Sequence, residues 1–223
     1  MQAAEKLFAS RSIDSVSLNE ITVAAGQKNR TALRYHFGSR DGLLQAIIDR
    51  HAIVVQALRR EYFDSLDSFD KPGNDESSAC RVAARGLVLP LGRHIETDAS
   101  GAHYVRILSQ LAALNSKIVN PASRSALSFH TDQRLTAVME EAVAHLPAEE
   151  AQRRFFLLLS ITFHGLADIC RAAEADNVAN TLTLRSAMIE QVALAVESLL
   201  AAPAITRATA ARPKKPSAPA AKG

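Results

Sequence analysis

Apolar residues recur at helical spacing along most of the chain, and no stretch shows the regular alternation of a β-strand. The pattern therefore predicts an all-α protein of about nine helices. An N-terminal group of four is expected over residues 2–11, 17–26, 29–36 and 40–64. Beyond a loop at 67–78, five more are expected over residues 76–95, 102–117, 122–146, 149–175 and 181–201.

Local end signals support several of these boundaries. Ser17 and Glu20 have the spacing of a capping box, in which each residue satisfies a backbone amide of the other at a helix start. Gly26 is placed for a left-handed C-terminal cap, and Ser39 can cap the long fourth helix. Pro90 should kink its helix.

The helices divide into a small N-terminal domain at 1–48, a larger helical domain at 49–202 and a tail at 203–223. The tail is rich in Ala, Pro and Lys and is expected to be disordered, because it cannot bury enough apolar surface. The apolar run at 155–163 has no hydrophilic side, so we expect burial on both faces. At nine residues, the run is too short to span a bilayer.

Composition narrows the class of protein. Cys80 and Cys170 are the only cysteines, which gives neither a disulfide framework nor a zinc motif. The start, MQAAEKLFAS, lacks the features of a signal peptide. These observations predict a cytoplasmic protein that has no membrane partner.

Charge is unevenly distributed. The net charge is +3, but the tail alone carries five basic residues and no acid, so the rest of the chain is about −2. Within that mildly acidic body, residues 27–40 carry Lys28, Arg30, Arg34 and Arg40 without an acid. Such a cluster is either a solvated helix face or a surface that contacts an anion.

The order of elements from Ser17 to Phe37 is helix, glycine-containing turn, helix. This arrangement lets a second helix enter a DNA major groove while the first lies across the backbone. The stretch SLNEITVAAGQKNRTALRYHFGSRDGLLQAI also resembles the N-terminal domain of TetR-type (tetracycline-repressor-like) transcriptional regulators, over roughly residues 3–50. The similarity includes Ser17, Ala25-Gly26, Tyr35-His36-Phe37 and Ser39-Arg40.

Two departures from the family pattern stand in this stretch. Thr22 replaces the usual small alanine, and a backbone carbonyl could accept its extra hydroxyl hydrogen. The segment between Gly26 and Tyr35 is one residue longer than the commonest family form, so the base-reading positions are not carried over one by one.

Chemistry assigns DNA-contact roles within this domain. Ser17, Tyr35 and Arg40 are the candidates for phosphate contacts, since a helix N-terminus, a hydroxyl and a guanidinium all bind phosphate. Arginine can bind guanine, asparagine can bind adenine, and a threonine methyl can contact thymine. The candidates for base contacts are Lys28, Asn29, Arg30, Thr31 and Arg34. Phe37 is expected in the core, and His36 is expected to be structural.

The resemblance further implies a homodimer that reads a palindrome in double-stranded DNA and responds to a small-molecule effector. The last two helices would pair across the dimer axis, although their apolar stripes could instead serve only the protomer's own core. Dimer-interface candidates are Phe163, Ile189, Val192, Val196 and Leu199. Candidate effector-lining residues, each of which could also be an ordinary core or surface residue, are His94, His103, Tyr104, Arg106, His130, Phe156, Phe163 and His164.

Catalytic signatures are lacking in the sequence. His164 and Asp168 lie four residues apart and could form one edge of a metal site, but no Glu-x-x-His motif, phosphate-binding glycine loop or nucleophile elbow accompanies them. We therefore expect no enzyme, no cofactor and no metal. The alternative to a regulator is a helical small-molecule-binding or interaction protein without sequence-specific DNA binding.

Overall fold

A computed structural model describes residues 1–27, 32–67, 79–114, 127, 130, 132–175 and 181–205. Over these ranges the chain is all-helical, as predicted, with nine α-helices, a short 3₁₀ helix and no strand. The helices are α1 (Gln2–Ser10), α2 (Leu18–Ala24), α3 (Ala32–Phe37), α4 (Arg40–Asp67), α5 (Ala79–Thr97), α6 (Ala99–Leu114), α7 (Gln133–Val143), α8 (Ala148–Ala175) and α9 (Thr181–Ala201). The 3₁₀ helix, η1, spans Ile13–Ser15.

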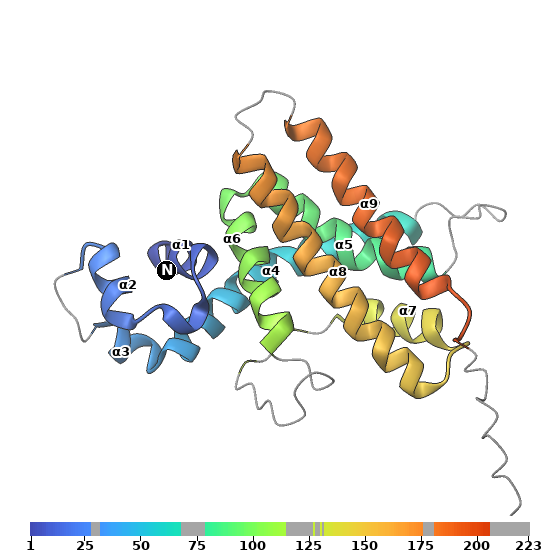
Figure 1. Ribbon diagram of the computed structural model, residues 1–223, viewed down its shortest axis with the longest axis horizontal. Helices are drawn as coiled ribbons and strands as arrows, with labels where there is room; N and C mark the ends of the chain where they lie inside the picture. The colour runs from blue at the N-terminus through green and yellow to red at the C-terminus, as the bar shows by residue number, and fades with distance from the viewer. Residues whose placement is uncertain are drawn as a thin grey trace, which may run out of the picture.

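The helices form two groups joined by the long α4 (Figure 1). The first three helices lie together at one end of the molecule. The long helices α8 and α9 lie side by side at the other end and pack on α5 and α6. Helix α4 is continuous from the small group into the large one.

Each group has its own core, but the smaller core is not built from the N-terminal helices alone. Phe8, Ile21 and Leu44 are buried there together with Ile107 and Leu111, both of which belong to α6. The larger core is formed mainly by α5, α6, α8 and α9. Helix α6 therefore contributes to both cores and fixes the small group against the large one.

The side chain of Gln110 adds a polar connection at the same place. Its oxygen accepts a hydrogen bond from the Ile13 amide at 2.9 Å. Its amide group donates to the carbonyl of Phe8 at 2.7 Å and to that of Arg11 at 3.3 Å. One side chain of α6 thus satisfies three backbone groups at the junction of α1 and η1.

Most predicted helix boundaries agree with the structure within a few residues, but the helix expected over 122–146 is shorter. Leu127 and His130 are not helical, and α7 begins only after Asp132. The Asp132 carboxylate accepts a hydrogen bond from the Leu135 amide at 3.0 Å, so it caps α7 at that point. Residues 121–126 lie outside the described residues. Helix α5 continues past Pro90 to Thr97.

The apolar run at 155–163 is not buried on both faces, contrary to expectation. Leu158 and Thr162 are fully buried, but Phe155 remains 49% exposed and Leu157 45% exposed. The reason is that the helices packed against α8 reach only part of its circumference. The sequence is apolar all round the helix, while the single chain covers only one side of it.

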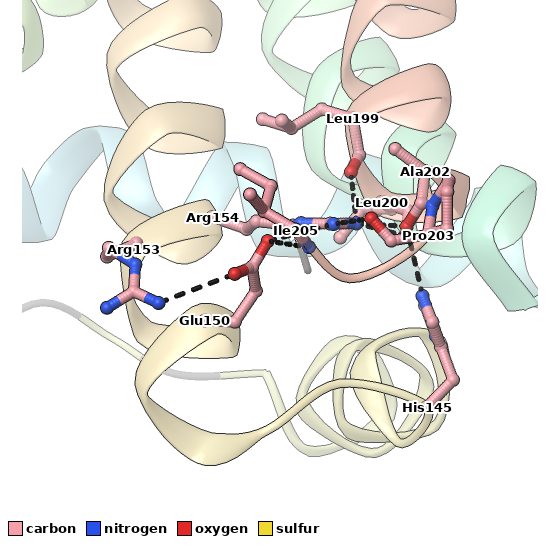
Figure 2. Close-up of polar contacts among 9 residues, drawn as sticks. All are labelled: His145, Glu150, Arg153, Arg154, Leu199, Leu200, Ala202, Pro203 and Ile205. Carbon is pink, nitrogen blue, oxygen red and sulfur yellow. Dashed lines mark hydrogen bonds and ion pairs between the residues drawn. The ribbon is translucent and has the colours of Figure 1, made fainter. Parts of the chain in front are cut away.

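The C-terminal end of α9 is held by a buried arginine of α8 (Figure 2). Arg154 donates through Nη1 to the carbonyls of Leu199 and Ala202, and through Nη2 to that of Pro203. Its charge is balanced by Glu150, whose carboxylate lies 3.1 Å from Nη2. The guanidinium therefore satisfies carbonyls that the last turn of a helix leaves without donors.

Candidate nucleic-acid interface

Helix α2 begins at the predicted capping box. The Ser17 hydroxyl oxygen accepts from the Glu20 amide at 3.2 Å, and the Glu20 carboxylate accepts from the Ser17 amide at 2.8 Å. The backbone hydrogen bond from Ser17, with a further bond from Arg11, lowers the pKa of Glu20 to about 2. The start of α2 is thus held by an ionised carboxylate and by an exposed Ser17 whose hydroxyl already engages Glu20.

The turn after α2 also follows the sequence. Gly26 has φ +65°, the left-handed conformation expected of a helix C-terminal cap. The Gly26 amide donates to the Val23 carbonyl, and the Gln27 amide donates to the Thr22 carbonyl. The buried Thr22 hydroxyl donates to the Leu18 carbonyl at 2.8 Å, which confirms how this departure from the family pattern is accommodated.

Helix α3 turns one side toward the core and the other toward solvent. Leu33 and Phe37 pack against the smaller core, as predicted for Phe37. Arg34, Tyr35 and His36 are exposed, and Tyr35 retains 86% of its accessible surface. The expectation that His36 is structural is wrong, because its ring lies on the outer side, edge-on to Tyr35 with centroids 5.4 Å apart. Lys28, Asn29, Arg30 and Thr31 lie outside the described residues.

Arg40 opens α4 beside the start of α2. Gly38 has φ +69°, which turns the chain, and the Ser39 hydroxyl then accepts from the Gly42 amide at 3.0 Å as the predicted cap. Arg40 donates to the Asp14 carbonyl at 3.0 Å and to the Asp14 carboxylate at 3.1 Å. An ion pair this exposed contributes little to stability, so a phosphate can compete with Asp14 for Arg40.

Ser17 and Arg40 line one open cleft of about 380 Å³, together with Asp14 and Asp41. Two predicted phosphate contacts, 23 positions apart in the sequence, are therefore neighbours in the fold. Their assignment to phosphate remains a prediction.

The predicted effector residues are not gathered in one place. His94, Tyr104 and Arg106 are buried, but Arg106 points to Glu174, at 2.7 Å, whereas the rings of His94 and Tyr104 lie together. Phe156 and Phe163 are half-buried, and burial lowers the pKa of His103. His130 and His164 are exposed and so do not line an interior cavity in this structure.

A groove of about 450 Å³ lies elsewhere, between α4, α5 and α9. Leu58, Tyr62 and Leu89 line it, and none of the residues predicted for an effector does so. Burial raises the pKa of Tyr62 to about 12, so this phenol stays protonated at neutral pH.

Two of the dimer candidates are corrected by the packing of α9. Ile189 is 4% exposed and Val196 is fully buried, both in the protomer's own core. A β-carbon added at Gly92 would lie 2.5 Å from an Ile189 methyl, which shows how closely α5 and α9 approach there. Phe163, Val192 and Leu199 are half-buried against the same core. The exposed large apolar residues of α9 are instead Leu184, Met188 and Leu194.

Potential metal ligands are dispersed. No group of three or more His, Cys, Asp or Glu side chains in the described part of the chain is arranged to hold a metal ion. His164 and Asp168 are both exposed, and Asp168 pairs with Arg171. Burial raises the pKa of the Cys170 thiol, and the Cys80 thiol donates to the Ala142 carbonyl at 3.7 Å.

Comparison with known proteins decides the nature of the N-terminal domain. Residues 1–47 match the family model of bacterial regulatory proteins, tetR family. The N-terminal domain is that of a TetR-type regulator. The TetR-type domain so defined contains α1, α2 and α3 and the start of α4, and it bears the exposed surface of Arg34, Tyr35 and His36.

The chain as a whole is also similar to a solved repressor structure at low sequence identity. It is 20% identical to the TetR family repressor AlkX from Dietzia sp. strain DQ12-45-1b, which is implicated in the biodegradation of n-alkanes. The match covers 89% of this chain and 94% of the other, with a TM-score of 0.32. No curated protein matches the chain.

Proposed function

We propose that this TetR-type regulator acts in the cytoplasm as a homodimeric repressor, which binds a palindromic operator and is released by a small, largely apolar effector. The observation that carries DNA binding is the outer side of α3. Arg34, Tyr35 and His36 project from it, while Leu33 and Phe37 anchor the opposite side in the core. A rigid helix with a cationic outer side can enter a major groove.

Phosphate contacts would orient this helix on the duplex. Ser17 and Arg40 flank α3 from the starts of the two neighbouring helices and share one cleft. Phosphate contacts position a DNA-binding domain without specifying sequence, whereas Arg34 and the basic segment at 28–31 would supply base contacts.

A dimer explains the apolar surface at the other end of the molecule. Phe155 and Leu157 of α8 and Leu184, Met188 and Leu194 of α9 are all more than 40% exposed. Exposed apolar side chains on two long neighbouring helices are what a two-fold dimer would bury. Within the described residues, α8 is also long and apolar enough to cross a membrane by length and composition. A second copy of the chain accounts for that composition equally well.

Effector release would operate through α4. This helix begins in the TetR-type domain at Arg40 and ends beside the larger core at Asp67. An effector that binds one arrangement of the core more tightly shifts the population toward it, and α4 carries the shift to the reading helices.

The alternative is a helical interaction protein that does not read DNA. The two functions differ in their response to salt. Each phosphate contact releases counterions, so duplex affinity must fall steeply with salt concentration for a DNA reader. Binding through an apolar surface shows no such dependence.

Selection of duplexes from a random library by the full-length protein tests the proposal directly. We expect palindromic sites with half-sites about one helical turn apart. Arg34→Ala should then weaken binding, and if Arg34 reads a base it should relax the preference at one position, by about 1–3 kcal/mol. The matched control is Arg60→Ala, which removes an exposed arginine of α4 outside the TetR-type domain. Equal affinities for the two variants would place the DNA surface elsewhere.

A further inference from the structure

A carboxylate of the TetR-type domain is buried where α1 meets the rest of the molecule. Glu5 is 1% exposed, although it belongs to a short N-terminal helix. Its Oε1 lies 3.1 Å from Nη1 of Arg50 and 3.6 Å from Nε2 of His51, both on α4. Arg50 also donates to the Ser100 hydroxyl at the start of α6, at 3.2 Å. The carboxylate thus faces two groups that can carry positive charge.

His51 continues the contact into the larger core. Its Nδ1 lies 2.8 Å from Nε2 of His94 on α5, which is a hydrogen bond between two fully buried rings. The phenol ring of Tyr104 on α6 stacks on His51 with centroids 4.6 Å apart. Glu5, His51 and His94 therefore form a row that runs from α1 through α4 to α5.

The number of protons on the two imidazole rings determines how strongly this row holds α1 against α4. When both rings are neutral, each carries one N–H group. His51 can then direct its N–H toward Glu5, and His94 can donate its N–H to His51. The His94 Nδ1 then has no partner, in agreement with its lack of any hydrogen bond in the structure. A third proton makes His51 an imidazolium that donates to His94 on one side and faces the Glu5 carboxylate on the other. At 3.6 Å the contact with Glu5 is longer than a hydrogen bond, so its attraction depends mainly on charge.

We propose that Glu5, His51 and His94 form a proton-linked clamp between the TetR-type domain and the core, so that DNA binding strengthens as the pH falls from about 8 to about 6. The inference rests on the proposed repressor function, in which the form that has Glu5 of α1 facing His51 is the form that binds DNA. A proton on His51 stabilises that form, because the carboxylate of α1 faces it only when α1 is docked. By linkage, DNA binding then favours proton uptake.

The pKa shifts of the groups beside His51 agree with this arrangement. Burial acts to raise the pKa of Glu5, but the contacts with His51 and Arg50 outweigh it and the pKa is lowered. Burial, and then the charge of His51, lowers the pKa of His94, which keeps that ring neutral. Burial raises the pKa of Tyr104 to about 12. Around the row, Arg50 of α4, His103 of α6 and the N-terminal amino group act on Glu5, while Tyr104 of α6 stacks on His51. Asp98, in the turn between α5 and α6, acts on His94.

The clamp lies where it can influence the reading helices. Helix α1 packs against α2 and against α6, and its Phe8 is buried in the same core as Ile21 of α2. A displacement of α1 therefore moves the start of the helix-turn-helix motif. Its position relative to α4 is what the charge on His51 controls.

The experiment measures the affinity of the full-length protein for a selected duplex at constant ionic strength between about pH 6 and pH 8. All proteins carry His36→Gln, so that the exposed ring of α3 makes no contribution to the measured pH dependence. We expect the Kd to fall by up to about tenfold per unit decrease in pH, the limit for one linked proton. Glu5→Gln should flatten this dependence. Glu61→Gln, the same change at an exposed carboxylate of α4, should preserve it.

A second variant and a second readout guard against ambiguous results. His51→Gln removes the ring that would take up the proton, so it should also flatten the pH dependence of the Kd. This variant tests the inference if Glu5→Gln does not fold. Hydrogen exchange of the α1 amides, corrected for intrinsic rates, should show protection that increases as the pH falls, and only when Glu5 is present. That measurement needs no DNA, so it judges the clamp even if no duplex is selected and the proposed function fails. A Glu5→Gln protein that keeps the pH dependence of the Glu61→Gln control overturns the inference.

Discussion

Two adjacent arginines of α8 provide the sharpest test of the structure, because they are chemically identical and differ only in surroundings. Arg154 is 4% exposed and makes five hydrogen bonds, four of them to carbonyls at the end of α9 and one to Glu150 (Figure 2). The Arg153 side chain is 57% exposed and reaches only Glu149 and Glu150, at 3.6 and 3.4 Å. Replacing each by Ala should therefore have very different consequences.

The magnitude follows from what each replacement leaves behind. Without Arg154, a buried carboxylate and several helix-end carbonyls lose their donor, and breaking a buried charged interaction costs about 3–5 kcal/mol. For a chain of this size, 1 kcal/mol shifts the Tm by about 2–4 °C, so Arg154→Ala should lower the Tm by about 6–20 °C. Arg153→Ala removes a surface pair of at most about 1 kcal/mol, which corresponds to no more than about 4 °C.

Thermal unfolding followed by circular dichroism gives both values. Protein concentration must be identical in the two experiments, since association makes the Tm depend on it. Arg154→Lys retains the charge but presents a single ammonium instead of a planar fork, so it should recover only part of the loss. If the two alanine variants unfold within a few degrees of each other, the end of α9 is not held as the structure indicates.

The remaining predictions concern other parts of the molecule. Leu157→Glu introduces a charge among the exposed apolar residues of α8 and should convert the proposed dimer into a monomer in light scattering; a dimer that persists would place the interface elsewhere. Gly38→Ala forces a side chain into the left-handed region at φ +69° and should destabilise the fold by about 1–2 kcal/mol in urea unfolding. Because the pKa of Glu5 is lowered in the folded state, its stabilisation is present above the ordinary value of 4.5 and is lost as the pH falls through the folded value. The Tm difference between the wild type and Glu5→Gln should therefore disappear in acid, and a difference that persists there would contradict the charge assigned to Glu5.

Much of the fold could be predicted from the sequence because its signals are local. The capping box at Ser17, the left-handed Gly26 and the apolar period of α4 each depend on residues within one or two turns. The start of α7 was missed for a related reason. The apolar spacing in the sequence continues on the N-terminal side of Asp132, so it predicts an earlier helix start than the cap does. Hydrophobic spacing alone does not decide where a helix starts.

What the sequence could not provide is which side of an apolar helix faces inward. On α9 the buried Ile189 and the exposed Met188 are consecutive and both apolar, so periodicity gave the wrong side to the proposed interface. Arg153 and Arg154 present the same problem for charge, as does Glu5 among the apolar residues of α1. In each case the buried residue has a partner more than 40 positions away, and such pairings depend on how helices cross rather than on local pattern.

The position of α6 limits how such a protein can transmit a signal. Ile107 and Leu111 lie in the core of the TetR-type domain, and Gln110 binds the backbone of α1 and η1, while Tyr104, Val105 and Leu108 lie in the larger core. The TetR-type domain is therefore not suspended from α4 alone. A movement of α6 must either carry α1 with it or break the Gln110 contacts and open the shared core. A packed core tolerates little continuous deformation, so the first outcome costs less free energy. We therefore expect α1 and α6 to move together as one rigid body, with α4 rotating relative to it.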